Sequence, residues 1–317
     1  ASRGVEYSDQ ARALYRGAIA GGDRAGRVAI AAIEQLANLE SRLAEIRGDP
    51  ALADCAIARL RHLDRAAAGS EDGDAEVDPP ASTWNAERAS LAGGAHKRKA
   101  AIFANKIIAG DRTAATVKAF NDAVQASIAA YEIGSGKPRD QRFDPYPALN
   151  WLSLKTLEGS YEAGIAVCLA CADRANERFK QSPDVWHAVM AAEAYLVESL
   201  CRGSLGRGDA SSEKAFEQVC KRYTDALTNI RYAPKDLESV AHQMCLLALF
   251  FDAKGATRTQ ASRAKVDRAL AQCLRRLADG MQPGSCKTPD RATPKENKQQ
   301  AQPAKRRGPR RAGPRRR

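Results

Sequence analysis

Apolar side chains recur at spacings of three and four along most of the chain, and this periodicity decides the fold class. One such stripe consists of Ile33, Leu36, Leu39, Leu43 and Ile46, and another of Val117, Phe120, Val124, Ile128 and Tyr131. Residues three and four apart lie on the same face of an α-helix, so each stripe predicts an amphipathic helix. The sequence contains no hairpin signal. Alanine, which costs least in a helix, is frequent, and aromatic residues make up only 6% of the chain. The sequence therefore predicts an all-α protein.

Start and stop signals divide the chain into successive helices. Gly48, Asp49 and Pro50 end one helix. Ser182, Pro183 and Asp184 begin another, with the Ser182 hydroxyl as the expected cap. The first helices are predicted over 8–20, 24–47, 51–68, 83–99 and 113–133. Three helix pairs are predicted after them: 148–157 with 160–179, 183–200 with 212–232, and 235–251 with 259–281.

The spacing of these pairs favours an α-solenoid. The first two pairs begin about 36 residues apart, with Trp151 and Trp186 at matching places. A pair of that length cannot bury its apolar face alone, but stacked pairs share a continuous core. A compact helical bundle is the alternative.

Composition changes at three places along the chain and predicts four parts. Residues 1–68 form N-terminal helices, 69–82 an acidic linker loop, 83–282 the helical repeat region, and 283–317 a basic tail. The tail holds 12 Lys or Arg against two acids, so most of the net charge of +12 lies there. It has almost no apolar residue, and we expect it to be disordered.

The end of the tail is the candidate nucleic-acid-binding segment. Eight positive charges fall in the last 13 residues. Guanidinium groups match phosphates, so weak, salt-sensitive binding to nucleic acid is expected, with a merely solubilising tail as the alternative. The candidate residues are Arg306, Arg307, Arg310, Arg311, Arg315, Arg316 and Arg317.

Three short motifs carry a family resemblance. They are Glu34-Gln-Leu-Ala-Asn-Leu-Glu40, Glu87-Arg-Ala-Ser-Leu-Ala-Gly-Gly-Ala-His-Lys-Arg-Lys99 and Asp144-Pro-Tyr-Pro-Ala-Leu-Asn150. Together they resemble a bacterial tetratricopeptide-like region that is related to the TRAF-binding regulatory region of stress-activated kinases. In the middle motif Gly93 supplies the small residue where helices approach, while His96 stands where tyrosine is typical.

The resemblance implies a regulatory, protein-binding scaffold. Such regions often work beside an effector domain, in cis or in trans, in bacterial signalling or defence proteins. The first helix of each pair usually lines the concave face of a solenoid. Polar residues on such helices are therefore candidates for binding a protein or peptide partner through an acidic group, although a solvated face is the alternative. They are Lys97, Arg98, Asn150 and Lys155.

No motif predicts catalysis, a cofactor or a metal. Cys168 and Cys171 form a C-x-x-C, but the pair falls inside an apolar helix and not at a helix N-terminus. The four histidines are far apart, and the Gly134-Ser-Gly-Lys137 stretch lacks the rest of a phosphate loop. We therefore expect a protein that is not an enzyme.

The eight cysteines and the length of the apolar runs indicate where in the cell the protein is expected. Because seven of the cysteines fall in helical stretches and no signal peptide is present, we expect free structural thiols and a cytoplasmic protein. No apolar run is long enough for a membrane span, so no membrane partner is expected.

Overall fold

The computed structural model describes residues 2–24, 30–67, 86–228 and 230–286. All of the described residues belong to one unit of the chain, Ala1–Lys287. The predicted acidic linker, 69–82, and the arginine-rich end of the tail both lie entirely outside the described residues.

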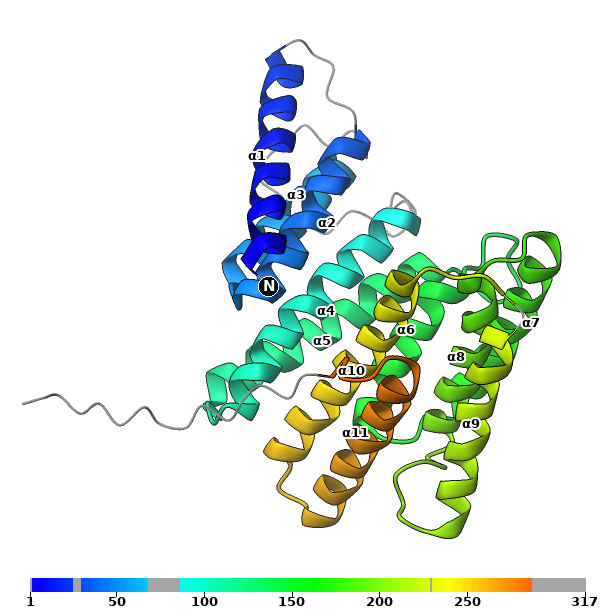
Figure 1. The fold of residues 1–317 in the computed structure, drawn as a ribbon. Coiled ribbons are helices and arrows are strands. Elements are labelled where there is room, and N and C mark those ends of the chain that lie inside the picture. Colours follow the sequence, from blue (N-terminus) through cyan, green and yellow to red (C-terminus); the bar gives the residue numbers. More distant parts are fainter. Residues whose placement is uncertain (1, 25–29, 68–85, 229, 287–317) are drawn as a thin grey trace, which may run out of the picture. The chain divides into compact units, whose positions relative to one another are not determined.

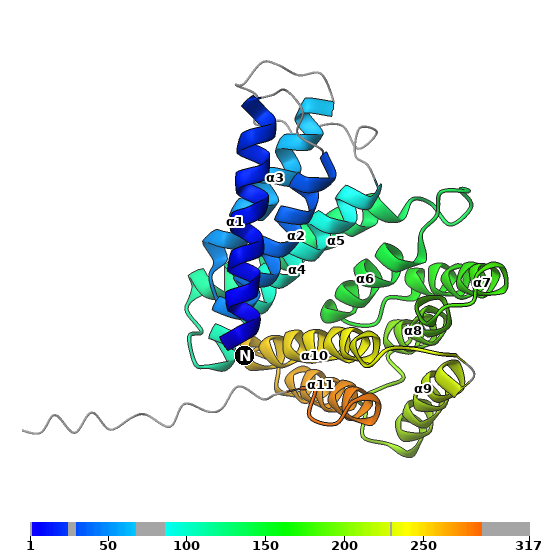
Figure 2. The same ribbon diagram turned by 45° about the horizontal axis from the view of Figure 1, so that its top comes forward.

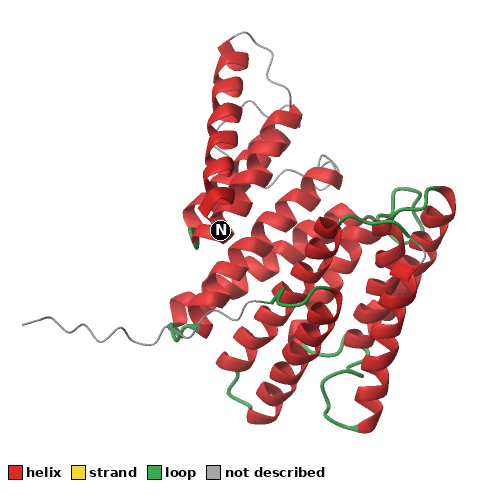
Figure 3. Ribbon diagram, viewed as in Figure 1, coloured by secondary structure: helices red, strands yellow, loops and turns green. Residues whose placement is uncertain are grey.

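Every regular element in the described residues is a helix (Figure 3). The first five α-helices are α1 (Ser2–Arg24), α2 (Ile30–Arg47), α3 (Pro50–Ala67), α4 (Ala86–Ile108) and α5 (Ala114–Ser135). The next three are α6 (Pro145–Lys155), α7 (Ile165–Gln181) and α8 (Val185–Cys201). The last three are α9 (Ala210–Thr228), α10 (Pro234–Thr257) and α11 (Ala261–Met281). Two short 3-10 helices, η2 (Thr156–Glu158) and η3 (Glu162–Gly164), connect α6 to α7. The prediction of an all-α protein is confirmed.

Local capping sets where several helices begin. Asp144 caps α6 by accepting from the Tyr146 amide, and Pro145 occupies the first turn. The prediction that Ser182 caps α8 is wrong. Asp184 is the N-cap, and its carboxylate accepts from the His187 amide at 2.8 Å. The carboxylate serves the exposed amides of the first turn better because it also opposes the positive end of the helix dipole.

Neighbouring helices pack in sequence order, as in a tetratricopeptide-like α-solenoid of antiparallel helix pairs (Figure 1). The closest pairs are α2 with α3, α4 with α5, α7 with α8, and α10 with α11. One extensive contact joins elements far apart in the sequence, because α10 also packs against α4. Figure 2 shows the N-terminal part of α4 and the length of α10 from a second direction. A helix from the C-terminal part of the described chain thus packs against a helix from its N-terminal half.

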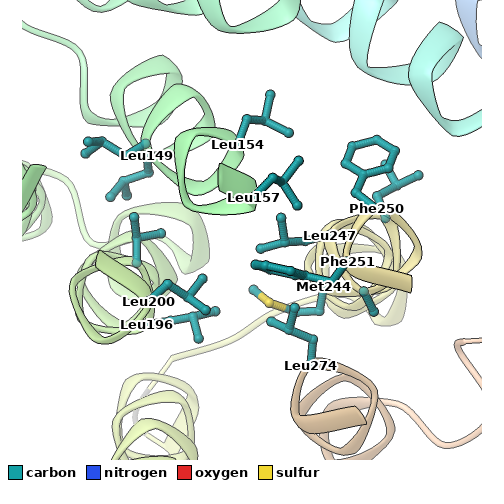
Figure 4. Close-up of a cluster of buried hydrophobic side chains, with 14 of the residues drawn as sticks. Leu149, Leu154, Leu157, Leu196, Leu200, Met244, Leu247, Phe250, Phe251 and Leu274 are labelled. Atoms are coloured by element: carbon teal, nitrogen blue, oxygen red, sulfur yellow. The ribbon is translucent and has the colours of Figure 1, made fainter. Parts of the chain in front are cut away.

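The largest apolar cluster gathers side chains from α4 to α11. In Figure 4, Leu157 points toward Leu247, while Met244 lies above Leu274 of α11. Phe250 and Phe251 of α10 are fully buried. Burial of leucine and phenylalanine side chains stabilises a fold by about 1.5–3 kcal/mol each, so α10 is a core element of the C-terminal helices.

A glycine sets the approach of α4 to α5. A Cβ atom on Gly93 would lie 2.7 Å from the Tyr131 ring, and the Ser127 hydroxyl donates to the Gly93 carbonyl at 2.8 Å. The sequence-based expectation that Gly93 is the small residue at a helix approach is confirmed.

The cysteines are not all free. Cys245 of α10 is disulfide-bonded to Cys286, and the other six are free thiols. The expectation of structural thiols is therefore wrong for this pair. It failed because the turn after α11, which returns Cys286 to α10, has no periodic pattern. None of the described helices is both long and apolar enough to cross a bilayer.

Candidate functional site

Polar side chains from five helices meet on the inner side of the stack, where α10 crosses α4. We call this set the inner polar cluster. Its members are Arg42 and Glu45 of α2, Lys97 and Arg98 of α4, Tyr146 and Asn150 of α6, Glu193 of α8, and His242 and Gln243 of α10. These even-numbered helices pack against one another, α2 on α4, α10 on α4 and α6 on α8.

Lys97 is the central cation of the cluster. Its side chain is buried, and its ammonium donates to the Asn150 carbonyl oxygen at 2.8 Å and to the Gln243 side chain. Burial lowers the pKa of Lys97 to about 8, while the charge of Glu193 acts to raise it. Both of its hydrogen-bond partners are neutral amides. They fix the position of the Lys97 ammonium but do not neutralise its charge.

Glu193 faces Lys97 from α8. Burial raises the pKa of the Glu193 carboxyl, and the charge of Lys97 only partly opposes that rise. No hydrogen bond or ion pair within 4 Å joins this carboxyl to another side chain in the described part of the chain. A half-buried carboxyl without a direct partner can accept a donor from outside.

Two arginines border the cluster on the α2 side. Arg98 donates to the Ser41 hydroxyl at 3.0 Å, and its Nε lies 3.6 Å from the Glu45 carboxylate. Burial would raise the pKa of Glu45, but the hydrogen bond from His242 at 3.3 Å and the nearby cations outweigh it and lower the pKa. Arg42 is open to solvent but borders protein on one side, and this partial burial, together with the charge of Arg98, lowers its pKa. Glu45 is therefore already satisfied, whereas Arg42 presents a guanidinium to solvent.

Tyr146 borders the cluster on the α6 side. Its side chain is 43% exposed, while partial burial raises the pKa of its hydroxyl. Its ring stands edge-on to Tyr131, at 6.4 Å between centroids, and Tyr131 is fixed against Gly93.

The structure brings three of the four predicted partner-binding residues together. Lys97, Arg98 and Asn150 belong to the cluster, and Lys97 bonds directly to Asn150. Lys155 is half-buried at the last residue of α6 and makes no hydrogen bond or ion pair with them among the described residues. Sequence reasoning missed Glu193 and the α10 residues, because Gln243 is 146 residues from Lys97.

Other chemistry considered from the sequence falls elsewhere. Cys168 and Cys171 are both buried in the apolar core, where burial raises the pKa of the Cys171 thiol. Among the residues with defined placement, no group of three or more His, Cys, Asp or Glu side chains is arranged to hold a metal ion.

Comparison with known families gives one match. Residues 7–155 match the family described as Tetratricopeptide Repeats-Sensor. Comparison with curated proteins and with solved structures gives no match. The matched segment ends at the last residue of α6, so it holds the α2, α4 and α6 side of the inner polar cluster. Residues 7–155 of this chain are thus a tetratricopeptide-like helical region, of the kind found in protein-interaction and sensor modules.

Proposed function

We propose that the chain is a non-enzymatic regulatory scaffold that binds an acidic segment of a protein partner at the inner polar cluster. The observation that carries this proposal is the convergence of charged and polar side chains from α2, α4, α6, α8 and α10. Helices of consecutive repeats supply such a surface only when they are stacked.

The charges of the cluster favour a carboxylate ligand. Arg42, Lys97 and Arg98 contribute three cations, and of the two carboxyls Glu45 already pairs with Arg98 and His242. Guanidinium groups bind carboxylates through paired N–H donors. Tyr146 adds an exposed aromatic surface and a hydroxyl. We propose that Arg42 and Arg98 bind the acidic side chains of the partner. Lys97 and Asn150 form the buried part of this site, and Lys155 extends the contact along α6.

Docking at this cluster would be communicated to the C-terminal helices. Gln243 and His242 belong to α10, whose other residues form the apolar core with α11. A partner that changes the position of Lys97 or Glu45 therefore changes contacts made by α10. We propose that this coupling regulates an effector domain, in cis or in trans, within a cytoplasmic bacterial signalling or defence protein.

Selection of peptides by the purified full-length chain tests the proposal. A display library of random 12-residue peptides should yield binders enriched in Asp and Glu. The double variant Arg42→Ala/Arg98→Ala should bind those peptides at least about tenfold more weakly, a loss of about 1.4 kcal/mol. Fluorescence anisotropy of labelled peptides measures the affinities.

Matched variants separate this site from general charge effects. Lys118→Ala removes an exposed lysine that pairs with Asp122 one turn further along α5, and it should leave binding unchanged. Selected peptides without acidic enrichment, or equal binding by the double variant, would refute the proposed site.

The arginine-rich tail supports a second candidate, a nucleic-acid-associated protein. Eight cations in the last 13 residues can displace counterions from phosphates. Deleting Thr288–Arg317 should abolish salt-sensitive binding to a duplex oligonucleotide while acidic peptides are still bound. Loss of peptide binding on the same deletion would instead assign partner capture to the tail.

A further inference from the structure

We propose that Cys245 and Cys286 form a reversible redox-modification site, which exchanges with a thiol–disulfide couple of the glutathione type and fastens the end of α11 to α10. This inference is independent of partner binding at the inner polar cluster. It starts from the six residues that end the described chain.

The residues after α11 form a preorganised reversal. The sequence Gln282-Pro-Gly-Ser285 places proline second and glycine third, as a type II turn requires. Gly284 has a φ of +76°, and the Ser285 amide donates to the Gln282 carbonyl at 3.2 Å. The turn therefore directs Cys286 back along the helix pair before any disulfide forms.

Contacts on both sides of the turn align it with α10. The Gln282 side-chain amide donates to Glu238 at 3.4 Å, and the Cys245 sulfur lies 3.8 Å from the Ser285 hydroxyl. The Cα atoms of Cys245 and Cys286 are 5.3 Å apart. That separation lies within the range of ordinary disulfides, so the bond fits the fold without movement of α10.

Access distinguishes this pair from the thiols of the core. Cys245 and Cys286 are both half-buried, whereas Cys168, Cys171 and Cys201 are buried. A small thiolate can therefore reach the disulfide. It attacks one sulfur and forms a mixed disulfide, and a second thiolate releases the other protein thiol. The protein disulfide gains two electrons and two protons, and two small thiols become one oxidised disulfide.

Reduction of the disulfide would change the mobility of one wall of a nearby cavity. An apolar cavity of about 320 Å³ lies between α9 and α11, and its wall includes Leu237, Leu277, Gly280 and Met281. Met281 ends α11 immediately before the turn that the disulfide holds. Reduction removes the covalent link and leaves this segment held by hydrogen bonds of Gln282 and Ser285, so the last turn of α11 should open and close more often.

The test uses the full-length chain carrying Cys55→Ser, which removes the exposed thiol. Samples are equilibrated at several ratios of reduced to oxidised glutathione, alkylated with iodoacetamide, and digested for mass spectrometry. The peptide pair joined through Cys245 and Cys286 should disappear at reducing ratios and return at oxidising ones. Amide hydrogen exchange over 280–286 should become at least tenfold faster on reduction.

Variants complete the test. Cys286→Ser in oxidising buffer should exchange as fast over 280–286 as the reduced parent chain, whereas the matched variant Cys220→Ser should retain the slow exchange. Alkylation of both cysteines at every glutathione ratio would overturn the proposal. So would equal exchange in the oxidised and reduced parent chain, a comparison that needs no substitution at either cysteine.

Discussion

Helices α1–α4 pack around buried ion pairs, whereas α6–α11 pack around leucine and phenylalanine. In the first region Glu40 is fully buried and accepts from Arg12, Arg16 and Arg59 at 2.8–3.0 Å. Asp64 is also fully buried and pairs with Arg88. In the second region the core is one large apolar cluster, which α4 and α5 also enter, although a buried carboxylate, Asp267, pairs with Arg258 there too.

The apolar clusters of the N-terminal helices are small and depend on alanine. One consists of Ala37, Ala56, Leu60, Ala92 and Ala130. Burying a charge is costly unless it is paired, and a buried pair often contributes specificity more than stability. The N-terminal helices therefore hold a defined arrangement that pH and salt can perturb, while the C-terminal helices supply most of the hydrophobic stabilisation. The inner polar cluster lies where these two kinds of packing meet.

The largest expected effect is in the apolar core. Phe250 is fully buried, and its ring centroid lies 5.8 Å from that of Phe120. Phe250→Ala should lower the free energy of unfolding by about 4 kcal/mol, because it removes buried area and leaves a cavity. Urea unfolding followed by circular dichroism measures the loss. Phe250→Leu should lose less than half as much, and an equal loss would argue against a cavity effect.

The next largest effect is expected when the ion network of the N-terminal helices is broken. Arg88 is 6% exposed and binds Asp64 at 2.5 Å and Glu34 at 3.0 Å. Arg88→Met should cost about 3 kcal/mol, because it leaves the Asp64 carboxylate buried without its partner. The double variant Arg88→Met/Asp64→Leu should recover most of that loss in the same unfolding assay. Additive losses in the double variant would contradict a buried pair.

A smaller effect is expected where the two regions join. Gly93→Ala places a methyl group 2.7 Å from the Tyr131 ring and forces α4 and α5 apart. The cost should be about 2 kcal/mol. Gly17→Ala in α1 meets nothing within 4 Å and is the matched control, which should be neutral or slightly stabilising in thermal unfolding.

The smallest expected effect is a difference between the two regions in how their stability depends on pH. Burial acts to raise the pKa of Glu40, but hydrogen bonds and charges from Arg59 and Arg12 outweigh it and lower the pKa below 4.5. Such a carboxyl stabilises the folded state above its unfolded pKa and loses that contribution as pH falls through the lower folded value. Hydrogen exchange should therefore show α1–α3 loosening below pH 4.5 before α10 and α11.

The expected size of this pH effect is about 1 kcal/mol, because the arginine partners are partly exposed to water. Glu40→Gln should remove the pH dependence of exchange in α1–α3. Simultaneous loosening of both regions would show that their stabilities are not separable.

Much of the candidate site was visible in the sequence, but not its assembly. Lys97, Arg98 and Asn150 could be chosen because polar residues on the first helices of repeats tend to line one face. Glu193 and Tyr146 could not, since Glu193 is one acid among many on a helix and Tyr146 looks like part of a capping turn. Whether Lys155 and the tail arginines bind partners stays a prediction.

The sequence by itself determined the helices, since apolar spacing and capping residues act within a few positions of one another. It also determined the close approach at Gly93, because only a missing side chain permits it. Tertiary structure alone decided that α10 returns to α4, that Lys97 meets Gln243, and that Cys245 meets Cys286. These contacts join residues brought together by the stacking of whole helices, and the free energy of that stacking is spread over many side chains with no local pattern.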